Sequence, residues 1–171
     1  NVIDRTDFEV LQPAIDYYQN HGTATDKLRT HYYEGRIYQN AGQGDLAMKS
    51  FIKAREVEGP ITDTLTLGNL LVAQATYYYS TYKVKEFIAN NQQAARLYEA
   101  IGHSYYQFRS LLNTLDGSIL NNDKPLADSI LTCCRSEIEK HPDYEASLLS
   151  YILSYTITFG ADEESTTTIE S

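Results

Sequence analysis

Tryptophan is absent from this chain of 171 residues, and only 2 cysteines and 4 prolines occur. No apolar run reaches the roughly 18 residues that a transmembrane helix needs, so the sequence predicts no membrane span. Cys133 and Cys134 are neighbours in a helical pattern and point to different faces, so a disulfide between them would be strained. Neither cysteine belongs to a spacing typical of zinc ligands, so both are interpreted as small residues that serve packing.

Positive charge is also scarce. The chain has 14 Lys and Arg against 23 Asp and Glu, which gives a formal net charge of −9. Phosphate binding needs clustered Lys and Arg, and the basic residues here are scattered. We therefore expect no nucleic-acid role for this segment. An acidic surface of this kind mostly confers solubility.

Catalytic and ligand-binding motifs are missing as well. There is no His-Glu-x-x-His, no Gly-x-Ser-x-Gly, no Walker loop and no Gly-x-Gly-x-x-Gly. The histidines lack the paired spacing of a metal site, and several lie near predicted helix ends, where they complement the helix dipole. They are His21, His31, His103 and His141. The expectation is a protein that is not an enzyme and that holds no cofactor and no metal.

Tyrosine, in contrast, is abundant, with 15 Tyr against 5 Phe. Many occur side by side, as in Tyr17-Tyr18, Tyr32-Tyr33, Tyr77-Tyr78-Tyr79 and Tyr105-Tyr106. Adjacent helix positions diverge by about 100°, so we expect one ring of each pair between helices and the other at a surface. Two interpretations stay open: all the rings serve interhelix packing, or several line a binding face.

The stretch 28–60 carries the most specific pattern. Gly35 and Ala47 are small, as two closely approaching antiparallel helices require, whereas Tyr38, Phe51 and Ala54 recur at helical spacing on one buried face. The sequence Gly-Gln-Gly-Asp at 42–45 predicts the turn between the helices, and Gly-Pro at 59–60 predicts the end of the second.

These spacings resemble the tetratricopeptide repeat (TPR), whose pattern is Trp-x2-Leu-Gly-x2-Tyr, then Ala-x3-Phe, then Pro. Two residues depart from it: His31 stands at the Trp position and Glu34 at the Leu position. The resemblance implies an all-α fold, namely a TPR-like helical-hairpin solenoid in which antiparallel helix pairs form a right-handed superhelix.

Extending this register divides the chain into a TPR-like domain over 1–160 and a tail. The domain consists of a half repeat at 7–21, repeats at 28–60, 63–101 and 103–142, and a final helix at 143–159. The second of these repeats is interpreted as expanded by about two helical turns. Asp26, Asp63 and Asp143 are predicted helix caps. The acidic, Thr-rich tail at 161–171 is predicted to be disordered.

The final helix is apolar nearly all round, which is unusual for the end of a solenoid. Three elements could cover this apolar helix, namely the segment after Gly160, a partner protein, or a further repeat. The further repeat is the favoured interpretation. Self-association through 143–159 is a related expectation.

In TPR proteins the first helix of each repeat lines the concave face, which implies a peptide-binding surface here. Its predicted residues are Arg29, Tyr32, Tyr33, Arg36, Gln39, Asn40, Tyr106, Arg109 and Asn113. Tyr, Arg and Asn can hold an extended peptide by stacking and hydrogen bonds. The family's carboxylate clamp is not reproduced, because Tyr32 stands where its Lys is expected and Arg36 where its Asn is.

The sequence thus favours a non-enzymatic module that binds a protein or peptide. Its Tyr-rich helices resemble TPR segments of longer bacterial regulatory, signalling or scaffold proteins, some of them membrane-tethered. Two alternatives remain: a ligand-sensing domain of a membrane-tethered transcriptional regulator, and a self-associating structural scaffold. The sequence does not distinguish a cytoplasmic from a periplasmic location.

Overall fold

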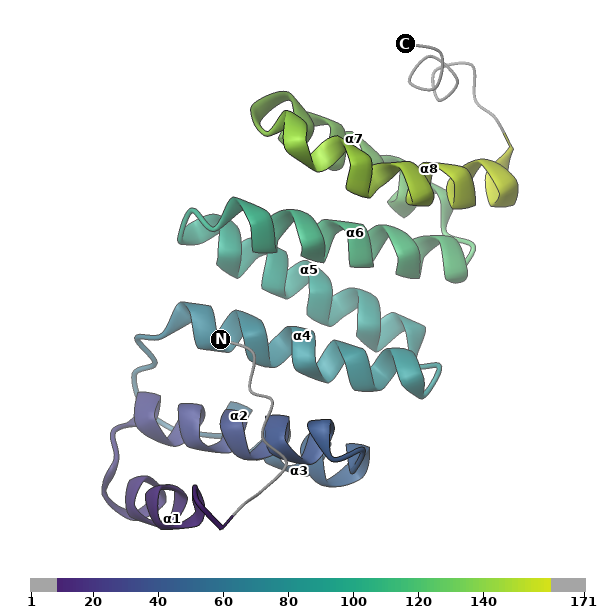
Figure 1. Cartoon of the computed structure of the whole chain (residues 1–171). Coiled ribbons are helices and arrows are strands. Elements are labelled where there is room, and N and C mark those ends of the chain that lie inside the picture. Colours follow the sequence, from purple (N-terminus) through teal and green to yellow (C-terminus); the bar gives the residue numbers. More distant parts are fainter. Residues whose placement is uncertain (1–8, 161–171) are drawn as a thin grey trace. The chain divides into compact units, whose positions relative to one another are not determined.

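The computed structural model describes residues 9–160 (Figure 1). Within them every regular element is helical, which confirms the all-α expectation for this part of the chain. The chain divides into two compact units, Asn1–Tyr77 and Tyr78–Ser171. The elements are α1 (Gln12–His21), α2 (Ala24–Asn40), α3 (Gly44–Arg55), α4 (Thr64–Ser80), α5 (Val84–Ala100), α6 (Ser104–Leu120), α7 (Lys124–Lys140), the 3-10 turn η1 (Pro142–Tyr144) and α8 (Glu145–Phe159).

The helix boundaries recur every 40 residues. Helices α2, α4 and α6 begin at Ala24, Thr64 and Ser104, and each has 17 residues. The helices that follow them, α3, α5 and α7, begin at 44, 84 and 124. The predicted two-turn expansion of the repeat at 63–101 is therefore wrong. Among these six helices only α3 differs in length, with 12 residues against 17 in α5, and the loop that follows α3 is longer by the same amount.

The turns after α2, α4 and α6 share this period. Gly42, Tyr82 and Asn122 all have a positive φ, of 73°, 58° and 53°. In each turn the next backbone N–H donates to a carbonyl five residues earlier, at 2.8–2.9 Å. This bond is typical of a helix that ends with one left-handed residue. Tyr82 is unusual there, because left-handed backbone disfavours residues with a Cβ.

The helix caps differ in part from the prediction. Thr23 caps α2, and Asp26 is its capping-box partner three residues on, so Asp26 is not the cap itself. Asp63 accepts a hydrogen bond from the Thr66 backbone at 2.9 Å, as predicted for the start of α4. The prediction for Asp143 is wrong: Asp143 lies inside η1, and α8 begins without a side-chain cap.

The core of the first unit forms where α2 and α3 approach closely. A Cβ added at Gly35 would lie 2.3 Å from Cε1 of Phe51, so only glycine fits. Phe51 is completely buried, and Ala47 and Ala54 are buried beside it. Tyr38 packs against the same cluster. The close approach and the shared buried face predicted for this stretch are confirmed.

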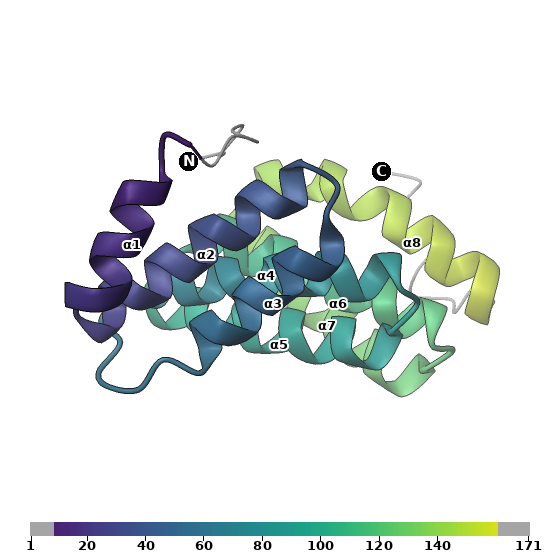
Figure 2. The same ribbon diagram turned by 90° about the horizontal axis from the view of Figure 1, so that it is seen from below.

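The core of the second unit is built by α6, α7 and α8, which lie next to one another in two perpendicular views (Figure 1, Figure 2). Its buried members are Phe108, Leu112, Leu115, Ile119, Ala127, Ile130, Leu131, Cys134, Leu148, Ile152 and Tyr155. Cys134 is thus a core residue, whereas the neighbouring Cys133 is exposed. Burial, with the nearby Cys133 and Glu137, raises the pKa of Cys134 to about 12.

The tyrosine doublets behave in two ways. Tyr32 is buried and Tyr33 is exposed, as expected for adjacent helix positions. Tyr17 and Tyr18 are both exposed, so the prediction of one packed ring is wrong for that pair. The reason lies in α1, whose only buried residue is Ile15. The tail at 161–171 and the start of the half repeat lie outside the described residues.

Candidate functional site

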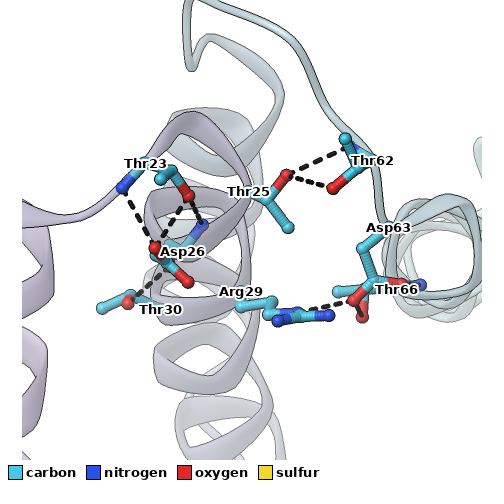
Figure 3. A network of polar contacts seen from close by, with 8 residues as sticks. All are labelled: Thr23, Thr25, Asp26, Arg29, Thr30, Thr62, Asp63 and Thr66. Atoms are coloured by element: carbon cyan, nitrogen blue, oxygen red, sulfur yellow. Dashed lines mark hydrogen bonds and ion pairs between the residues drawn. The ribbon is translucent and has the colours of Figure 1, made fainter.

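On α2, Arg29 belongs to a polar network that joins this helix to the start of α4 (Figure 3). Its Nε donates to the Asp63 carboxylate at 2.6 Å. Burial opposes ionisation of Asp63, but bonds from the Thr66 backbone and hydroxyl and from Arg29 outweigh it and lower the pKa of Asp63. Arg29 was predicted on the binding face, and its charge is already paired within the first unit.

A second contact of this network fixes the loop before α4. The Thr62 backbone N–H donates to the Thr25 hydroxyl at 3.0 Å, and the two hydroxyls lie 3.2 Å apart (Figure 3). At the start of α2, the Thr23 hydroxyl and backbone donate to Asp26 and lower its pKa. The network therefore holds the ends of two helices together, which is a structural role.

The two departures from the TPR pattern interact with each other. His31 Nδ1 lies 3.4 Å from the Glu34 carboxylate, one helical turn away. The hydrogen bond from His31 is the main cause that lowers the pKa of Glu34, against burial, with a further bond from Ser50. A polar pair thus occupies positions where the family pattern has apolar bulk.

The other predicted residues of α2 have different environments. The Tyr32 ring is buried beside Phe51, with ring centroids 6.4 Å apart, so its placement on a binding surface is corrected to the core. The Gln39 amide donates to the Ala73 carbonyl at 3.2 Å and links α2 to α4. Asn40 is exposed at the end of α2, and Tyr33 is exposed midway along it. Only part of the predicted set is thus open to a partner.

Arg36 differs from all of these. Its Nε is buried and has no hydrogen-bond partner, and no ion pair joins its guanidinium to any described residue. A buried charged donor left unpaired costs on the order of 1–3 kcal/mol or more, and such groups call for a functional explanation. Arg36 stands one turn after Tyr33 on the same side of α2. A cation and an exposed ring are therefore adjacent here.

In the second unit, two predicted residues of α6 are engaged in packing. The Tyr106 ring stacks on His103, with centroids 4.3 Å apart, and lies 5.3 Å from Tyr98. The Asn113 side-chain amide donates to Oδ1 of the Asn91 side chain at 3.0 Å, and Asn91 itself is buried on α5. These side chains join neighbouring helices and leave little polar capacity for a ligand.

Arg109 is exposed on the same helix and pairs with no carboxylate among residues 9–160. Its guanidinium lies 6.0 Å from the centre of the Tyr105 ring, a cation–π contact. Asp116 stands two turns further on, half-buried, and no described residue donates to it. Burial raises the pKa of Asp116. The pKa of Tyr151 on α8 is raised first by burial and next by Asp116, whereas Arg109 lowers it.

Sequence reasoning missed Tyr105, Asp116 and Tyr151. The helical spacing could have found Asp116, because it lies three residues after Asn113 and seven after Arg109, on the same side of α6. Tyr151 could be identified only from the packing of α8 against α6, and no local sequence pattern predicts that packing.

Metal-binding clusters and membrane-spanning helices are both absent from the described part of the chain. No group of three or more His, Cys, Asp or Glu side chains within it could hold a metal ion. None of its helices combines the length and apolar character that crossing a bilayer demands.

Comparison with known proteins adds no assignment: no family model matches the chain, and no curated protein or solved structure is significantly similar to it.

Proposed function

We propose that this chain is a non-enzymatic, TPR-like solenoid that binds a protein or peptide. The binding helices would be α2 and α6, each of which is the first helix of its repeat. The observation that carries the proposal is the buried, unpartnered Nε of Arg36. The Arg36 side chain as a whole is only half-buried, so a partner's carboxylate would pair with the accessible amino groups of the same guanidinium and neutralise its charge. Tyr33 beside it offers an apolar ring at little entropic cost.

The second unit supports the same proposal with a different set of groups. Arg109 and Tyr105 present a cation and a ring, and Asp116 offers a carboxylate with free acceptor capacity. Asp116 is half-buried and burial raises its pKa, so a donor or cation supplied by a partner would offset the solvation that this carboxylate has lost. An extended peptide with both acidic and basic side chains would satisfy these groups.

The test is a selection of peptides from a random displayed library on the immobilised chain, followed by titration calorimetry. The affinity of the selected peptides should fall for Arg36→Ala by about 1.5–3 kcal/mol, which is roughly tenfold or more. Arg96→Ala is the matched control, because Arg96 is an exposed arginine on α5, outside the first helices. If the Arg36 and Arg96 variants bind every peptide as the parent does, the proposal is wrong.

A further inference from the structure

Helix α8 exposes a face that is almost free of charge, although the chain carries a formal net charge of −9. Its exposed residues are Glu145, Ala146, Ser147, Leu149, Ser150, Leu153, Ser154, Ile157 and Thr158. Only Glu145, the first residue of the helix, is charged. The opposite side of α8, with the buried Leu148, Ile152 and Tyr155, is the one that packs on α6 and α7. The large apolar side chains of the exposed face are poorly suited to water.

The large apolar residues of this face form one ridge. Leu149, Leu153 and Ile157 are 46%, 60% and 76% exposed and follow one another at four-residue steps. Next to the ridge lies a parallel row of small side chains, Ala146, Ser150 and Ser154, also at four-residue steps. Rows of this kind are the ridges and grooves by which two helices pack.

The polar atoms of the groove are already satisfied in part. The Ser154 hydroxyl donates to the Ser150 carbonyl at 3.2 Å. Forty residues earlier, the Thr114 hydroxyl donates to the Ser110 carbonyl at 2.8 Å, and both of those residues are buried. In α6 this row faces α5, because a Cβ added at Gly117, one turn on, would lie 2.6 Å from Ile88. The same row is thus a helix-packing surface in α6 and is open in α8.

We propose that α8 docks against α8 of a second copy of this chain, in an antiparallel and twofold-symmetric pair. The ridge and the groove lie on the same helix, so the face is complementary to itself, as a twofold interface requires. With the axis near Leu153, Leu149 of one copy lies opposite Ile157 of the other. This inference is independent of peptide binding by α2 and α6.

Charge favours a second copy meeting at this face. Two chains of net charge −9 repel each other, and the repulsion is smallest where neither surface carries carboxylates. The residues that follow Gly160 are a poor chemical match for the ridge, because 161–171 contain four acidic side chains and only two apolar ones, Ala161 and Ile169.

The size of the face sets the strength of the pair. Stable interfaces bury about 800 Å² per partner, and three partly exposed side chains with their small neighbours provide less than that. We therefore expect a weak dimer that forms and dissociates with concentration.

Analytical ultracentrifugation over a wide concentration range tests the pair. The parent should pass from monomer to dimer, whereas Leu153→Glu and Ile157→Glu should stay monomeric at every concentration. Both side chains are mostly exposed, so the variants should keep their helical circular dichroism. Leu46→Glu is the matched control: Leu46 is 40% exposed on α3 in the first unit, and its variant should dimerise like the parent.

A charge-swap experiment tests the symmetry. Leu153→Glu and Leu153→Lys should each be monomeric alone and should form a mixed dimer when combined, because the axis brings the two residues together. A head-to-tail contact of α8 with the exposed Tyr17 and Tyr18 of another copy would give no such recovery. The proposal is overturned if the parent is monomeric throughout, if Leu153→Glu associates like the parent, or if the mixture stays monomeric.

Discussion

Replacement of Gly35 by alanine should destabilise the first unit, although alanine is the better helix former. The new Cβ would lie 2.3 Å and 2.5 Å from two ring carbons of Phe51 and 3.1 Å from the Ala47 backbone oxygen. The Phe51 ring is completely buried and is enclosed by Tyr32, Ala47, Ala54, Leu70 and Ala73, so it has no open space to enter. Helices α2 and α3 must move apart instead.

Two opposing terms set the magnitude. Alanine gains about 1 kcal/mol over glycine in a helix interior. Overpacking of a filled core costs about 1–3 kcal/mol, and the upper part of that range applies because one of the clashes is with backbone. The net effect should be a loss of about 1–2 kcal/mol, which lowers the melting temperature by roughly 2–4 °C per kcal/mol in a chain of this size.

Thermal and urea melts followed by circular dichroism measure the change. Phe51→Leu supplies the control, because a smaller side chain makes room for the new methyl group. In that background the same Gly35→Ala change should become neutral or stabilising, and a double-mutant cycle gives the coupling. If Gly35→Ala raises the stability of the parent chain, the close approach of α2 and α3 is not as described.

Four further predictions concern other residues. Ala47→Leu should cost about 1–3 kcal/mol in a urea melt, because Ala47 lies at the same helix contact; an unchanged midpoint would contradict this. Ellman's reagent should label Cys133 alone in the native protein and Cys134 only after unfolding, since burial raises the pKa of Cys134 to about 12; two fast native thiols would refute it. Asp116→Asn should raise the melting temperature at neutral pH and not at pH values below the carboxyl pKa. Because burial raises that pKa, the folded state binds the proton more tightly, and the parent gains stability as the pH falls through it; a pH-independent effect would argue against the burial of Asp116. Tyr82→Gly should stabilise by about 0.5–1 kcal/mol, because it removes a left-handed residue with a Cβ; a loss of stability would show that the Tyr82 ring makes packing contacts that matter.

The sequence pattern predicted the helices well because helical periodicity and turn residues are local. Gly35, Ala47 and Phe51 were placed correctly, since their sizes report the contact between α2 and α3 directly. The 40-residue period was missed, because Tyr82 carries a large side chain where Gly42 marks the equivalent turn.

The candidate site was less predictable, because hydrogen bonding between distant residues decides which side chains are available. Arg29 and Arg36 are the same residue type on one helix, and the sequence does not show that Asp63 pairs with the first and leaves the second unpaired. Asp116 likewise became a candidate binding residue only because the structure shows that its carboxyl group is half-buried, which the sequence does not reveal.

The near absence of charge along α8 also limits how this helix can be studied. No lysine or arginine occurs between Lys140 and Ser171, so trypsin does not cut within α8. Amine-directed cross-linkers cannot attach anywhere along the helix. A contact through α8 would therefore be reported by lysine cross-linking only through amines on neighbouring elements, such as Lys124 and Lys140. Chymotrypsin, which cuts after Tyr151, Tyr155 and Phe159, and a cysteine placed at Leu153 for disulfide trapping are the reagents that can detect it.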